Sequence, residues 1–139
     1  MYKERLRLTQ PFLFLYVYTN INQNTIVMKL ITKAIEAAFA KQGDTSQMEM
    51  SEIKIVMKLF NPWGAGTWYI YEKIDEDTYM AFVNLNDPMC AECGYVSMQE
   101  IAEWKHPVFR MGIERDMHFE PLSITLKSVY ETIKAGGHV

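Results

Sequence analysis

The segment between Ile53 and Leu85 constrains the fold most, because it holds three strand-like runs separated only by two short turns. Residues 53–59 largely alternate apolar and lysine side chains, the period-two pattern of a strand with one buried face. Residues 67–74 are rich in Trp and Tyr, and residues 78–85 are apolar on both faces, as in a central strand. Runs so closely spaced predict an antiparallel sheet.

Helical patterns lie on both sides of this segment along the chain. Residues 29–42 carry apolar side chains at helical spacing and are followed by Gly43, a typical helix stop. Ser97 and Glu100 have the spacing of a capping box, which predicts a helix from there to about residue 105. A last apolar stripe over residues 126–133 is followed by two glycines and predicts a third helix.

Short strands are expected at residues 92–96 and 112–119, between the helical patterns. The sequence therefore predicts the α+β class, an antiparallel sheet of about four to five strands packed with about three helices. We expect residues 28–139 to form this one domain.

Residues 1–27 differ in character from the rest of the chain. Three basic residues precede the apolar run 11–18, and a polar stretch follows. This is the charge order of a signal peptide, but no small residues mark a cleavage site. Three interpretations stay open: an extension outside the native domain, an added edge strand, or an export signal, and we favour the extension. No apolar run approaches the roughly 20 residues of a membrane span, so a cytoplasmic protein is expected.

The charge balance of the domain bears on its partners. Residues 28–139 hold 11 basic and 16 acidic residues, a net charge of −5. Nucleic-acid affinity usually comes from a broad basic surface, so direct binding of DNA or RNA is not expected. An acidic surface suits a protein partner that is itself basic, such as a nucleic-acid-binding protein.

The two cysteines form a C-x-x-C motif, Cys90-Ala-Glu-Cys93. A zinc finger would add two histidines about three to five residues apart, whereas eleven residues separate His106 from His118. A redox pair would open a helix, whereas the residues after Cys93 have an extended pattern. We therefore interpret both cysteines as ordinary thiols and expect no metal and no cofactor.

The candidates for a binding site are polar or aromatic side chains at strand positions where packing alone does not require them. They are Trp68, Glu72, Glu92, Tyr95, Glu114, Arg115 and Asp116. Glu72 shares a strand face with Trp68 and Ile70, and a carboxylate among apolar neighbours is one mark of a general acid or base. The simpler interpretation is that Glu72 is solvated or pairs with a lysine, Lys54 or Lys58.

The other candidates also have a structural and a functional interpretation. Gly94 allows a bulge or a close backbone approach beside Glu92 and Tyr95. Arg115, flanked by acids, could brace the sheet through a bidentate ion pair or contact a ligand or partner.

Several aromatic residues of the strands could form a stacking platform for bases or the core of the sheet: Trp63, Trp68, Tyr69, Tyr71 and Tyr79.

Signatures of catalysis are weak. The acidic candidates have spacings that match no known loop for a divalent ion. The chain has no G-x-S-x-G nucleophile elbow, and the glycines of residues 62–67 open no helix that could bind phosphate. We expect no catalytic residues and favour a protein that is not an enzyme.

These segments, in this order, resemble the family known as domain of unknown function 2958. The matching motifs are MKLITK at 28–33, VMKLFNP at 56–62, TWYIYE at 67–72, GYVSMQEI at 94–101 and IERDMHFEP at 113–121. The resemblance covers about residues 28–130 and implies a domain start at Met28. Members come largely from bacteria, plasmids and phages, and the family implies no catalytic residues.

The sequence therefore predicts a small, soluble, non-enzymatic protein-interaction module of a bacterium, phage or mobile element. Inhibition of a host defence nuclease is one form of that function, because an acidic domain can occupy a basic nucleic-acid groove. The alternative is a small-ligand-binding or hydrolytic domain that uses Glu72, Glu92 and the Glu114–Asp116 cluster. That alternative requires these side chains to converge on one pocket.

Overall fold

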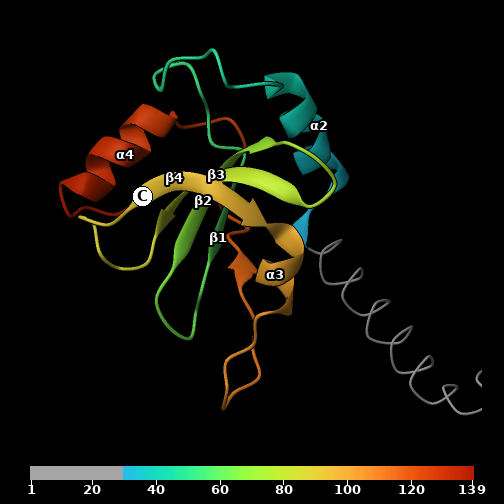
Figure 1. The fold of residues 1–139 in the computed structure, drawn as a ribbon, viewed down its shortest axis with the longest axis vertical. Coiled ribbons are helices and arrows are strands. Elements are labelled where there is room, and N and C mark those ends of the chain that lie inside the picture. Colours follow the sequence, from blue (N-terminus) through green and yellow to red (C-terminus); the bar gives the residue numbers. More distant parts are fainter. Residues whose placement is uncertain (1–29) are drawn as a thin grey trace, which may run out of the picture.

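The computed structural model describes residues 30–139, and the predictions for residues 1–27 lie outside this range (Figure 1). Within it the chain forms three helices and five strands in an α+β arrangement, as predicted. The helices are α2 (Lys33–Gln42), α3 (Met98–Glu103) and α4 (Leu126–Lys134). The strands are β1 (Met57–Phe60), β2 (Thr67–Lys73), β3 (Thr78–Asn84), β4 (Glu92–Ser97) and β5 (Glu114–Arg115).

The five strands form one sheet in the order β4-β3-β2-β1-β5, and every neighbouring pair is antiparallel. β3 has a neighbour on each side, which confirms that the run apolar on both faces is an internal strand. A register shift between Ile70 and Glu72 interrupts the pairing of β2 with β3. β4 and β5 are the two edge strands, with three strands between them.

Two apolar cores flank the sheet, because side chains alternate between its faces. On one face, side chains such as Leu59 and Ile70 pack with the buried residues of α2 and α3. On the other face, Tyr69 and Phe82 pack with the buried residues of α4. Figure 1 shows the same division, with α4 on one side of the strands and α2 and α3 on the other.

Each helix begins after a hydroxyl side chain that accepts a backbone hydrogen bond. Thr32 accepts from the N–H of Ile35, Ser97 from that of Glu100 and Thr125 from that of Ser128, at 3.2 to 3.3 Å. The N-cap predicted at Ser97 is confirmed. The first predicted helix begins later than expected, at Lys33, because Thr32 supplies its cap.

Two predicted strands are shorter in the structure. The expected strand 53–59 contributes only its second half to β1, because Ile55 donates its N–H to the carbonyl of Ile124 and Lys54 pairs with Thr125. The expected strand 112–119 is reduced to the two residues of β5, because the chain turns at Asp116, whose side chain accepts from the N–H of His118 at 2.9 Å. The first segment thus bonds to a distant part of the chain, and the second is ended by a local turn.

Candidate functional site

A groove of about 660 Å³ opens between α3, the β1–β2 turn and the loop that follows α3. Figure 1 shows that turn and that loop at the same end of the molecule. All three tryptophans of the chain line the groove, together with further apolar and a few polar side chains. We call this the aromatic groove; its main lining residues are Asn61, Trp63, Trp68, Leu85, Tyr95, Ser97, Glu100, Ile101, Trp104, His106 and Ile113.

The β1–β2 turn is held by Asn61, which makes three hydrogen bonds across it. Its backbone N–H donates to the carbonyl of Gly66 at 2.9 Å, and its side-chain oxygen accepts from the N–H of Trp63 at 3.0 Å. Its side-chain nitrogen donates to the carbonyl of Ala65 at 3.3 Å. An asparagine is suited to this position because its amide mimics a backbone turn. The turn therefore fixes the backbone that carries Trp63.

Gly66 fixes the neighbouring tryptophan. Its φ is +131°, a region that side chains with a Cβ rarely adopt. A Cβ at this position would lie 2.5 Å from the ring of Trp68. The indole of Trp68 therefore lies directly against the backbone of Gly66, and both the backbone angle and the ring position require glycine.

Gly66→Ala is expected to displace the Trp68 ring and to lower the free energy of unfolding by about 2 kcal/mol. Urea denaturation would measure the loss of stability, and tryptophan emission the movement of the ring. Gly94→Ala is the matched control, because no atom lies within 4 Å of its Cβ position. Equal effects of the two substitutions would contradict this role of Gly66.

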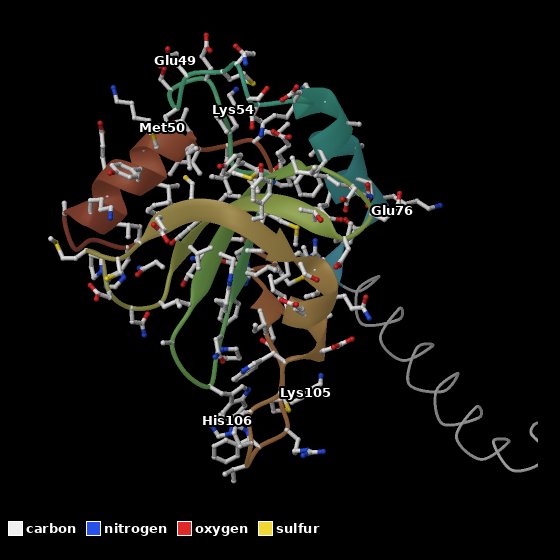
Figure 2. All side chains as sticks on the ribbon, in the orientation of Figure 1. Glu49, Met50, Lys54, Glu76, Lys105 and His106 are labelled. Carbon is white, nitrogen blue, oxygen red and sulfur yellow. The ribbon has the colours of Figure 1, made fainter. Side chains whose placement is uncertain are left out.

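The loop that follows α3 is closed by its own hydrogen bonds. His106 donates its N–H to the carbonyl of Met111 at 2.8 Å, and its Nδ1 accepts from the N–H groups of Val108 and Phe109 at 3.1 and 3.2 Å. Lys105 pairs with Gly112 at its base. Figure 2 shows Lys105 and His106 on this loop, which projects beyond α3. The loop is a fixed structure that presents its side chains to solvent.

Aromatic contacts join the loop to the β1–β2 turn. The Phe109 ring lies 4.9 Å from that of Trp63 and 4.9 Å from that of His106, between ring centroids. Trp104 meets His106 edge-on at 6.5 Å. The rings are only partly covered: Trp63 is 38% exposed and Trp104 37%. Large exposed apolar side chains continue this surface, namely Leu85, Tyr95, Val108, Phe109 and Met111.

Of the candidates named from the sequence, Trp68 and Tyr95 line the aromatic groove. Glu72 lies elsewhere, in a separate hollow beside α2. It is 8% exposed and accepts a hydrogen bond from the backbone N–H of Thr45 at 2.7 Å and another from the Thr45 hydroxyl. The simpler interpretation is therefore wrong: Glu72 is neither solvated nor paired with a lysine, and its partner is a threonine. This carboxylate holds the segment after α2 onto β2.

The remaining acidic candidates lie apart from one another. Glu92 is on the edge strand β4, and Glu114 is on the opposite edge strand β5. Asp116 lies 3.4 Å from the Nζ of Lys58. The structure therefore does not bring the acidic candidates together, and within residues 30–139 no three His, Cys, Asp or Glu side chains are placed to hold a metal ion.

Arg115 does not form the bidentate ion pair considered from the sequence. Its Nη2 lies 3.1 Å from the sulfur of Met117, and its Nε is buried without a hydrogen-bond partner among the described residues. No ion pair of Arg115 with its flanking acids is present in that range.

The aromatic residues considered as a stacking platform divide between core and groove. Tyr69, Tyr71 and Tyr79 are buried in the two cores. Burial raises the pKa of the Tyr71 and Tyr79 phenols, so both stay neutral at physiological pH. Trp63 and Trp68 belong to the groove.

Both cysteines are free thiols. A hydrogen bond with Asp87 raises the pKa of Cys90, and desolvation raises that of Cys93. Because the thiolate is the reactive form of cysteine, raised pKa values make both poor nucleophiles at neutral pH.

Trp104 and His106 were not singled out as site residues from the sequence. The available signal was the density of aromatic side chains between residues 104 and 109, where a helix ends before Pro107. Aromatic side chains in a connecting loop do not belong to the buried face of a strand. Connecting loops also carry binding residues more often than the helices and strands that they join.

The fold and the groove define a small α+β domain that exposes a cluster of tryptophans at one end of its sheet. The chain belongs to the family described as "Protein of unknown function (DUF2958)", whose sequence model matches residues 30–139, and this confirms the resemblance. No curated protein and no solved structure matches the chain. Within residues 30–139 no helix has the length and apolar character needed to cross a membrane.

Proposed function

We propose that this protein is a non-enzymatic interaction module that binds a protein partner through the aromatic groove. The observation that carries the proposal is the gathering of all three tryptophans in one groove, two of them more than one-third exposed. Tryptophan is enriched among the residues that dominate the energy of protein interfaces. Large contiguous apolar surface on a small domain usually marks an interaction site.

The charge of the domain favours a basic partner. Residues 28–139 carry a net charge of −5, which would steer a positively charged surface toward them. Such a partner could be a nucleic-acid-binding protein, and occupation of the basic groove of a host defence nuclease is one form of the function. A phage or mobile element would gain from such an inhibitor.

The arrangement of reactive groups supports a non-enzymatic role. The acidic candidates are dispersed over both edges of the sheet and the hollow beside α2. Both thiols have raised pKa values. None of these groups lines the aromatic groove, whose ionisable side chains are those of Tyr95, Glu100 and His106.

The test is affinity capture by the tagged full chain from a lysate of the organism that carries it, with mass spectrometry of the captured proteins. We expect the wild type to retain a stoichiometric partner and Trp63→Ala to lose it. Tyr130→Ala is the matched control, since Tyr130 is 39% exposed but lies on α4, across the sheet from α3. Capture that is unaffected by Trp63→Ala, or no capture at any salt concentration, would refute the proposal.

A further inference from the structure

We propose that the aromatic groove binds a cationic side chain, preferentially arginine, which stacks on the exposed indoles and pairs with Glu100. This inference rests on the proposed function and specifies the chemistry of the partner segment that enters the groove. It follows from the position of Glu100, from the composition of the groove lining and from the way α3 is capped.

Glu100 is the acidic residue of the groove lining among the described residues. Its backbone N–H donates to the Ser97 hydroxyl at 3.2 Å, but its carboxylate has no hydrogen-bond or ion-pair partner within residues 30–139. In that range no lysine or arginine lines the groove either. The groove thus combines an unpaired negative charge with a largely apolar wall.

The carboxylate of Glu100 takes no part in the capping of α3. In a capping box, the glutamate side chain would turn back to the N–H of the cap residue. Here Asp77, in the β2–β3 turn, accepts hydrogen bonds from the first turn of the helix. Its side chain accepts from the N–H of Gln99 at 2.7 Å and from the Ser97 hydroxyl, and its carbonyl accepts from the N–H of Met98 at 3.0 Å. These contacts cap the helix without Glu100, whose carboxylate stays available to the groove.

The tryptophans suit a cation as well as an apolar group. Indole is the strongest aromatic partner for a cation, and a planar guanidinium stacks on it better than an ammonium does. Arginine can also form two parallel hydrogen bonds with a carboxylate. Glu100 is itself an exposed residue, so an arriving guanidinium can reach its carboxylate from solvent.

Among the residues that line the groove, the basic side chain is that of His106. The Nδ1 of His106 accepts hydrogen bonds from the N–H groups of Val108 and Phe109, at 3.1 and 3.2 Å. This nitrogen is therefore bound within the loop and does not pair with Glu100.

The inference can be tested by tryptophan fluorescence of the full chain, because every tryptophan lies in the groove. The probes are acetyl-Leu-Arg-Leu-amide and the same peptide with citrulline, which keeps the shape and loses the charge. We expect the arginine peptide to bind about fivefold tighter or more. Glu100→Gln should remove this difference, whereas Glu103→Gln on the same helix should retain it.

The outcomes separate this inference from the proposed function. Equal binding of both peptides, or no effect of Glu100→Gln, would overturn the cation site and leave the groove as an apolar docking surface. Failure of both peptides to bind would also overturn it. The proposed function is then decided independently by the effect of Trp63→Ala on capture. Quenching by oligothymidylate at low salt, which we do not expect, would overturn the inference by assigning the groove to nucleobases.

Discussion

Replacing Trp104 with alanine should weaken binding of the partner at least about 30-fold and change the free energy of unfolding by no more than about 1 kcal/mol. Trp104 caps α3, lines the aromatic groove and meets His106 edge-on, but it lies outside both buried cores. Removal of a buried interface tryptophan commonly costs about 2 kcal/mol or more of binding energy, and about 1.4 kcal/mol is tenfold in affinity. Titration calorimetry with the purified partner would measure the change.

Tyr130→Ala separates loss of the groove from loss of any exposed aromatic residue. Tyr130 has nearly the same exposure as Trp104, and its ring packs on Phe82 at 5.6 Å on the opposite face of the sheet. Its replacement should leave affinity for the partner unchanged. If Tyr130→Ala weakened binding as much as Trp104→Ala, the binding site would not be confined to the groove.

Replacing Glu72 with alanine should lower the free energy of unfolding by about 3 kcal/mol, because two buried donors of Thr45 would lose their acceptor. For a domain of this size that loss lowers Tm by roughly 10 °C. Urea and thermal denaturation would measure both quantities. Partner binding by the folded fraction should not change, since Glu72 lies in a separate hollow.

Glu72→Gln is the conservative counterpart, because the amide keeps an oxygen that can accept from Thr45. It should retain most of the stability that Glu72→Ala loses. A Glu72→Ala variant as stable as the wild type would show that this carboxylate does not hold the loop. It would then reopen a functional role for the only glutamate that is buried within residues 30–139.

The sheet could be predicted from the sequence because its signals are local. The alternation and turns of residues 53–85 predicted the three internal strands, and Ser97 predicted the start of α3. The lengths of β1 and β5 could not be predicted, since Ile55 bonds to Ile124 and the chain turns at Asp116. The bond from Ile55 joins segments far apart along the chain, whereas the turn at Asp116 is local and interrupts a pattern that otherwise suggests a longer strand.

The candidate site was harder to predict for a similar reason. The aromatic groove forms where the β1–β2 turn, α3 and the following loop meet, and no local pattern places these three segments together. Trp68 and Tyr69 are adjacent strand residues of similar character, yet one lines the groove and the other is buried under α4. The apolar neighbours of Glu72 along β2 correctly indicated that it is buried. Its partner, Thr45, could not be predicted, because it lies 27 residues away along the chain.

Site-specific photo-crosslinking tests the central claim, that the aromatic groove is where the partner binds, most directly. A photoreactive amino acid at Leu85 would probe the groove, and one at Tyr130 would probe the opposite face of the sheet. We predict that the partner crosslinks to Leu85, that the crosslinked partner segment contains an arginine, and that Tyr130 gives no crosslink. A partner that crosslinks at Tyr130 and not at Leu85 would contradict the assignment of the groove as the binding site.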